Sequence, residues 1–106
     1  MHLQHDIPSQ EITGAEVVVP ELIYTVPERF KLKMTETTLT NLGDSDATVV
    51  LSDGDGADFV DKLEVIVPTG QTIQLTGIMR HFSQGVYVSV LTQGMTVAVS
   101  SSGYLC

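Results

Sequence analysis

The sequence predicts an all-β fold: an antiparallel, jelly-roll-like β-sandwich of two sheets with an extended N-terminal arm. Several short runs carry apolar residues at every second position, which is typical of strands with one buried face. Clusters of Gly, Pro, Asn and Asp separate these runs at intervals of roughly 8–12 residues, as in sandwiches and barrels. No ten-residue stretch combines helical periodicity with helix caps. The chain has 106 residues, of which 42% are hydrophobic, and this indicates one globular domain.

The clearest pair of strands lies between Lys62 and Leu75. The residues that alternate along it on one face are Leu63, Val65, Val67, Ile73 and Leu75. Between the two runs, Pro-Thr-Gly supplies a fixed φ, a polar residue and a residue free to adopt positive φ, which together predict a turn.

The other strands follow the same alternation. We expect them near residues 22–26, 30–34, 48–51, 86–91 and 95–100, with a short edge strand at Val17, Val18 and Val19 before Pro20. Between Met34 and Leu39 the apolar positions change parity, which indicates a β-bulge near residues 35–38.

Residues 1–15 are polar and show neither period, so residues 1–19 are predicted to form an arm and residues 20–106 the sandwich. Such an arm either has no role or reaches across to a neighbouring subunit. Cys106 is the one cysteine, which excludes an internal disulfide and is consistent with folding in a reducing compartment. The start of the sequence has neither the basic nor the apolar region of a secretory signal.

The formal net charge is −8, which disfavours nucleic acid and anionic membranes as partners. No apolar run approaches the ~20 residues that span a bilayer. The charge is unevenly spread. Three of the five basic residues are Arg29, Lys31 and Lys33, and an acidic loop contains Asp53, Asp55 and Asp58. Either both groups are solvated surface, or the basic strip on one subunit contacts the acidic loop on a neighbouring subunit.

Catalytic and metal sites are not indicated. Counted from Asp53, the acidic loop fails the EF-hand spacing, which leaves a solvated turn or a different oxygen-ligand site. His2 and His5 form an HxxH pair, but zinc needs three or four ligands in fixed geometry. His81 has no evident nucleophile partner or orienting acid. We therefore expect no enzyme activity and no cofactor. A carbohydrate-binding sandwich stays open, with Tyr87 as the best residue for stacking on a sugar ring.

Residues 24–101 resemble small all-β virion structural proteins of tailed bacteriophages. The features that carry the resemblance are, in order, YTVP, the segment NLGDSDATV, the pair LEVIVPTGQTIQLTGIM, the strand GVYVSV and the end MTVAVSSSGY. The sequence departs from the pattern at Glu28-Arg29, where Ala-Gly is expected. The resemblance implies a structural role and no catalytic residues.

On that resemblance, the expected function is a capsid decoration or cement protein on the outer surface of the virion, made in the host cytoplasm. Its partners would be the major capsid protein and copies of itself, with a trimer favoured by analogy. The alternative within this class is a tail, neck or fibre-attachment protein. The residues predicted to make contacts between subunits are His5, Ile7, Val17, Val18, Val19, Arg29, Lys31, Lys33, Asp53, Asp55 and Asp58.

Overall fold

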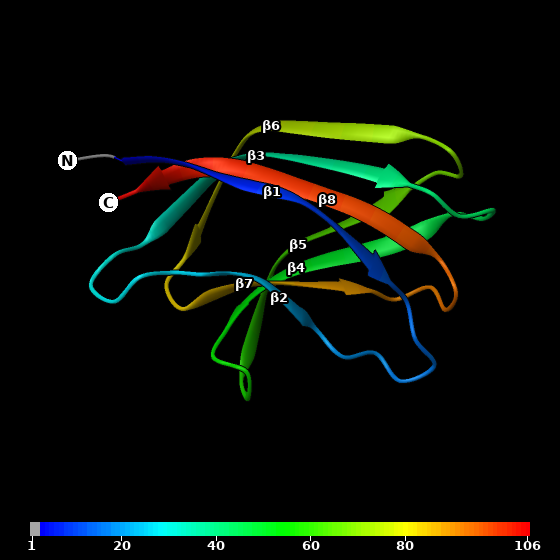
Figure 1. Ribbon diagram of the computed structural model, residues 1–106, viewed down its shortest axis with the longest axis horizontal. Coiled ribbons are helices and arrows are strands. Elements are labelled where there is room, and N and C mark those ends of the chain that lie inside the picture. Colours follow the sequence, from blue (N-terminus) through cyan, green and yellow to red (C-terminus); the bar gives the residue numbers. More distant parts are fainter. Residues whose placement is uncertain (1–2) are drawn as a thin grey trace.

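The computed structural model describes residues 3–106, except for the side chains of residues 77–79. Its strands are β1 (Leu3–Thr13), β2 (Glu21–Thr25), β3 (Leu32–Asn41), β4 (Ala47–Gly54), β5 (Phe59–Val67), β6 (Thr72–Phe82), β7 (Gly85–Val90) and β8 (Thr96–Leu105). They form two four-stranded antiparallel sheets, in the orders β1-β8-β3-β6 and β2-β7-β4-β5 (Figure 1). This is the strand arrangement of a jelly roll, so the predicted fold class is confirmed.

The core lies between the two sheets and is mainly aliphatic, as the alternation predicts. In β3, buried and half-buried residues alternate until the register against both β6 and β8 shifts between Met34 and Glu36. The predicted bulge is therefore present. The largest fully buried side chains include Phe82, Leu32, Met34, Leu39 and Leu51. Burial of such side chains is the main favourable term in folding.

The predicted N-terminal arm is wrong, because Leu3–Thr13 forms β1 of the sandwich. This strand pairs with β8 from Leu3 opposite Leu105 to Thr13 opposite Thr96. Its register shifts between Ile7 and Gln10, and the proline within that interval lacks the N–H that a ladder needs. The boundary predicted at residue 19 thus does not separate an arm from the sandwich.

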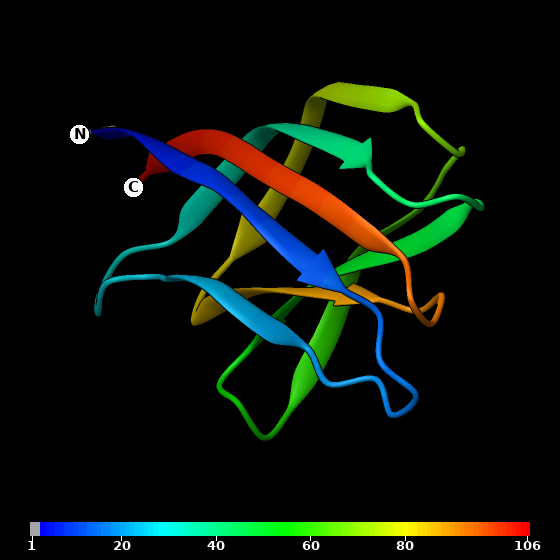
Figure 2. The same cartoon turned by 45° about the vertical axis from the view of Figure 1, so that its right-hand side comes forward.

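The predicted edge strand at Val17, Val18 and Val19 is also wrong, because residues 14–20 form the connection between β1 and β2. Gly14 anchors this connection: its N–H donates to Met95 O at 2.9 Å, and its own carbonyl accepts from the Gly94 N–H at 2.9 Å. The two sheets and this connection are seen from a second side in Figure 2.

The molecule is elongated, with principal extents of 43 × 28 × 18 Å. Because successive strands run in opposite directions, the connections alternate between two ends. The β2–β3 and β6–β7 connections lie toward the chain termini, and the β1–β2, β3–β4, β5–β6 and β7–β8 connections lie at the far end (Figure 1). Residues 3–106 contain no helix long and apolar enough to cross a membrane.

Candidate functional site

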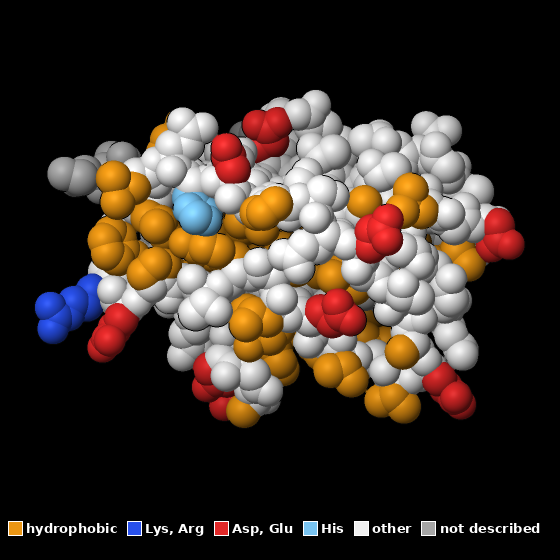
Figure 3. All heavy atoms as spheres, viewed as in Figure 1, with side chains coloured by type: hydrophobic (Ala, Val, Ile, Leu, Met, Phe, Trp, Pro, Cys, Tyr) orange, Lys and Arg blue, Asp and Glu red, His pale blue; other side chains and the backbone are white. Residues whose placement is uncertain are grey.

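The basic residues gather on a turn near the termini. Phe30 N–H donates to Pro27 O at 3.0 Å and closes this turn, in which Arg29 has a φ of 71°. The backbone of Lys31 is held by Cys106 through two hydrogen bonds of 2.9 and 3.0 Å. On the face shown in Figure 3, Lys and Arg side chains occur at this end with an acidic side chain beside them, and other Asp and Glu side chains are spread over the rest.

These cations are available to a partner. Arg29 and Lys31 are exposed, whereas Lys33 is half-buried on β3 between His81 of β6 and Tyr104 of β8. Within the part of the chain that the structure describes, the side chains of Arg29, Lys31 and Lys33 form no ion pair.

Asp53 belongs to the sandwich itself, not to a free loop. Its carboxylate accepts hydrogen bonds from the backbone N–H groups of Ser83, Gln84 and Gly85 at 2.9, 3.0 and 3.3 Å. The Ser83 hydroxyl adds a fourth at 3.1 Å. Partial burial raises the pKa of Asp53, but these hydrogen bonds outweigh it and leave the pKa below its usual value.

Asp55 closes the loop that follows. Its Oδ1 accepts from the backbone N–H groups of Ala57 and Asp58, each at 2.9 Å, and these bonds, led by that from Asp58, lower the pKa of Asp55. Among the side chains described, no group of three or more His, Cys, Asp or Glu could hold a metal ion. Both oxygens of Asp53 and Oδ1 of Asp55 thus accept hydrogen bonds from the protein's own N–H groups.

The remaining residues singled out from the sequence are dispersed. His5 is half-buried, and its ring lies against that of Tyr24 with centroids 4.5 Å apart, so it joins the edge strands β1 and β2. Ile7 is a core residue that is 3% exposed. His2 lies outside the described residues. Tyr87 is half-buried and packs edge-on against Phe59 at 4.9 Å, which removes it as an open platform for a sugar.

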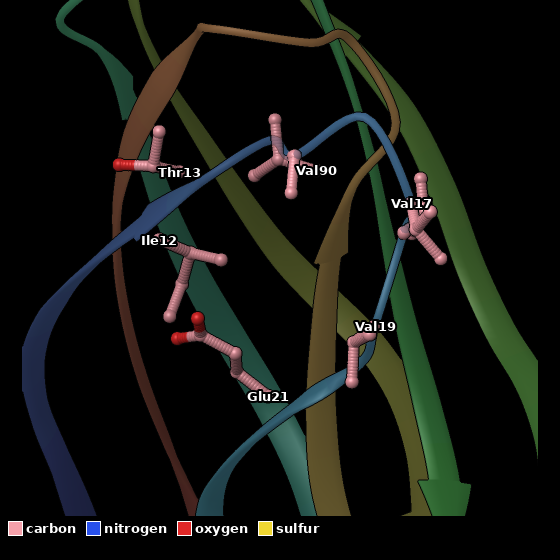
Figure 4. A pocket seen from close by; sticks show the side chains of 8 residues that line it. Ile12, Thr13, Val17, Val19, Glu21 and Val90 are labelled. Carbon is pink, nitrogen blue, oxygen red and sulfur yellow. The ribbon is translucent and has the colours of Figure 1, made fainter.

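An apolar hollow opens at the far end, under the β1–β2 connection. It has a volume of about 140 Å³ and is lined by Ile12, Thr13, Ala15, Val17, Val18, Val19, Glu21 and Val90. Val17 and Val19 are 74% and 68% exposed, and Val18 is 39% exposed. Figure 4 shows these side chains arriving from β1, β7 and the connection. Exposed valines around a hollow are typical of a contact surface.

A second depression is polar. It lies on the outer face of the sheet that contains β1, β8 and β3, and it is lined by Asp6, Ile7, Glu36, Thr38, Ser100, Ser101 and Ser102. Glu36 already accepts a short hydrogen bond from the amide of Gln74. None of these residues is a histidine, cysteine or lysine, and the acids beside the hydroxyl groups are Asp6 and Glu36.

Sequence reasoning missed two features of this surface. It placed Phe30 in a strand, whereas Phe30 lies before β3 with 37% of its surface exposed. It also did not predict that Val90 and the valines at 17–19 line the same hollow, because these segments are far apart in the chain. The available signal was the triplet of valines between Glu16 and Pro20, which is too apolar for a solvated loop.

No protein-family model matches the sequence, and no match was found among curated proteins. A solved structure of Bacillus endospore appendages, described as a novel family of disulfide-linked pili, superposes with a TM-score of 0.54 and 14% identity. The match covers 98% of this chain and 86% of that one. The crystal structure of PirA covers 97% of this chain and 92% of its own, with 13% identity and a TM-score of 0.44. At 14% identity, the first likeness shows a shared fold.

This comparison contradicts the resemblance to phage virion proteins. A solved structure that shares the fold over nearly the whole chain is from a bacterial appendage, not from a phage. The residues that carried the resemblance form turns and alternating strands, which unrelated sandwiches share for the same physical reasons. The predicted role as a capsid decoration protein, the capsid protein as partner and the phage virion as location are therefore wrong. The tail, neck and carbohydrate-binding alternatives fit no better.

Proposed function

We propose that this protein is a structural subunit that assembles with copies of itself into a filamentous appendage on a cell or spore surface. The observation that carries this proposal is the likeness to the endospore appendage structure, which extends over 98% of this chain. Self-association is the part of the predicted partnership that this proposal retains.

The proposed role is mechanical. In the described side chains no hydrogen bond joins a histidine to a hydroxyl or thiol group, the contact on which nucleophilic catalysis depends. The residues at the two ends are instead apolar or charged, and they suit contact with another protein.

Successive copies are joined by non-covalent contacts. The related appendages are described as disulfide-linked, but this chain has one cysteine, Cys106. A single thiol can join two chains and no more, so disulfides alone cannot extend a polymer of this chain. Area buried between subunits must provide the cohesion, at roughly 25 cal/mol per Å² before the costs of association.

The test is the size of the purified chain in a reducing buffer, measured by sedimentation velocity over a wide range of concentration and by electron microscopy. We expect a concentration-dependent shift from monomers to unbranched filaments, because subunit contacts obey mass action. Cys106→Ser serves as the matched control and should behave in the same way. A uniform monomer at every concentration would contradict the proposal.

A further inference from the structure

We infer that successive copies join head to tail, with Phe30 of one copy inserted into the apolar hollow under the β1–β2 connection of the next. This inference rests on the proposed function and specifies which two surfaces meet. The turn that carries Phe30 lies near the termini, and the β1–β2 connection, which lines the hollow, lies toward the opposite end of the long axis (Figure 1).

The exposure of Phe30 and the conformation of its turn suit a residue that binds a partner. It is 37% exposed at the end of a turn whose third residue, Arg29, has a φ of 71°. A non-glycine residue in the left-handed region costs about 1–3 kcal/mol, and such residues cluster at functional sites. Glycine would satisfy this turn without strain, but it would remove the cation next to the exposed ring.

The hollow matches a phenyl ring in size, and most of the residues that line it are apolar. Its volume is about 140 Å³, close to the roughly 150 Å³ of an engineered apolar cavity that binds benzene. Ile12 and Val90 line it from the strands, and Val17 and Val19 line it from the connection (Figure 4). A ring seated there would cover the valines that the isolated subunit leaves in water.

The charges around the two surfaces are complementary. Arg29 and Lys31 flank Phe30 and outnumber the one acid of this turn, Glu28. Glu16 and Glu21 lie beside the valines, and all five charged side chains are exposed. Two copies with a net charge of −8 repel each other in most orientations. When the basic turn of one copy lies beside Glu16 and Glu21 of the next, the local interaction between the two copies is attractive. Such rim charges direct orientation and association rate more than they add affinity.

Pairing is hindered at two of the four sheet edges, those of β1 and β5. The edge of β1 is interrupted at Pro8, where the register with β8 shifts. Arg80 Nε donates to Lys62 O at 2.9 Å, so β6 covers part of the edge of β5. Exposed Asp61 and Glu64 place charge on that strand. Two different surfaces at opposite ends give a heterologous contact, which builds an open chain of subunits.

The test uses two variants, each of which spoils one surface. Phe30→Asp removes the ring and places an acid next to Glu16 and Glu21, and Val19→Lys places a cation in the hollow to repel Arg29. Each variant alone should stay monomeric at concentrations up to at least about 30-fold above that at which the wild type assembles. Mixed together, they should form a 1:1 dimer at concentrations where neither assembles alone, because one intact turn meets one intact hollow.

Two controls distinguish a failure of the head-to-tail contact from misfolding of a variant or a general effect of an added charge. Val60→Lys introduces the same cation at a position that is 62% exposed on β5 and should assemble like the wild type. Circular dichroism verifies that each variant is folded. If the wild type forms filaments and either variant does too, or if the mixture forms no dimer, the head-to-tail contact is wrong while the proposed function stands. If the wild type forms no filaments, the proposed function itself fails.

Discussion

The carboxylate of Asp53, in β4, holds both the backbone N–H and the hydroxyl of Ser83, at 2.9 and 3.1 Å. Ser83 begins the turn between β6 and β7, strands that belong to different sheets. One side chain from the β2-β7-β4-β5 sheet therefore fixes the point at which the chain crosses between the layers. The other carboxylate oxygen of Asp53 accepts hydrogen bonds from the N–H groups of Gln84 and Gly85.

Asp53→Asn should destabilise the sandwich, because an amide offers one acceptor oxygen where the carboxylate offers two. Hydrogen bonds to charged groups contribute about 1.5–3 kcal/mol each when they are well formed. Since Asp53 is half-buried and solvent weakens these bonds, we expect a total loss of about 1–2 kcal/mol. Urea denaturation at neutral pH measures it. Asp44→Asn, at an exposed acid with no hydrogen bond among the described residues, is the matched control.

The stability of the wild type should also depend on Asp53 as the pH falls. Folding lowers the pKa of Asp53, so the folded state favours its ionised form. This stabilisation is complete above the unfolded value of about 3.9 and is lost as the pH falls through the lower folded pKa. Asp53→Asn should therefore flatten the acid limb of the stability curve below about pH 4. An unchanged acid limb would mean that other carboxylates carry the effect.

Asn41 should be the most sensitive polar residue of the far end. It is 2% exposed, and its amide nitrogen donates to Ser45 O at 2.8 Å and Val67 O at 2.9 Å. Its oxygen accepts from the Gly43 N–H at 2.8 Å. Asn41→Ala leaves these backbone groups without partners and should cost about 2–4 kcal/mol in unfolding free energy. Thr40→Ala, which removes one exposed bond to Thr72, should cost less than about 1 kcal/mol.

Cys106 should be dispensable for assembly. It is exposed, and oxidation can pair it with one other chain. Non-reducing electrophoresis of oxidised filaments should therefore show monomers and dimers only, and Cys106→Ser should leave filament length unchanged. Filaments that dissolve on addition of a reductant would refute the non-covalent account.

Arg29→Gly should weaken assembly without lowering the stability of the folded monomer. Glycine relieves the positive φ but loses more backbone entropy on folding, so the unfolding free energy should stay level or rise by up to about 1 kcal/mol. Assembly should weaken, because a cation next to Phe30 is lost. Stability is measured with Val19→Lys present, which keeps the chain monomeric, and assembly is measured without it. Arg29→Lys, which retains charge and strain, should assemble like the wild type.

The fold class followed from local patterns, because alternation and turn chemistry act within a few residues. The strand β1 was missed for an equally local reason. Its buried residues Ile7 and Ile12 have opposite parity, since the bulge around Pro8 shifts the register between them. The rest of this edge strand is largely exposed and polar, so no alternation remained to identify it.

The candidate site was less accessible to sequence reasoning. Arg29 and Lys31 were recognised as a possible contact surface from charge alone. The acidic partner was placed at Asp53, Asp55 and Asp58, yet the structure engages the first two internally. The hollow needs Ile12, Val90 and the valines to meet in space, and one sequence does not reveal such long-range contacts.

The most direct test of end-to-end assembly is an engineered crosslink between the two surfaces. The chain would carry Cys106→Ser together with Glu16→Cys and Lys31→Cys, which lie next to the valines and next to Phe30 and leave both of these apolar surfaces intact. Oxidation of assembled protein should give a ladder of covalent multimers on a non-reducing gel, and either single cysteine alone should give no ladder. Monomers only, or a ladder that the single-cysteine controls reproduce, would contradict head-to-tail assembly through Phe30.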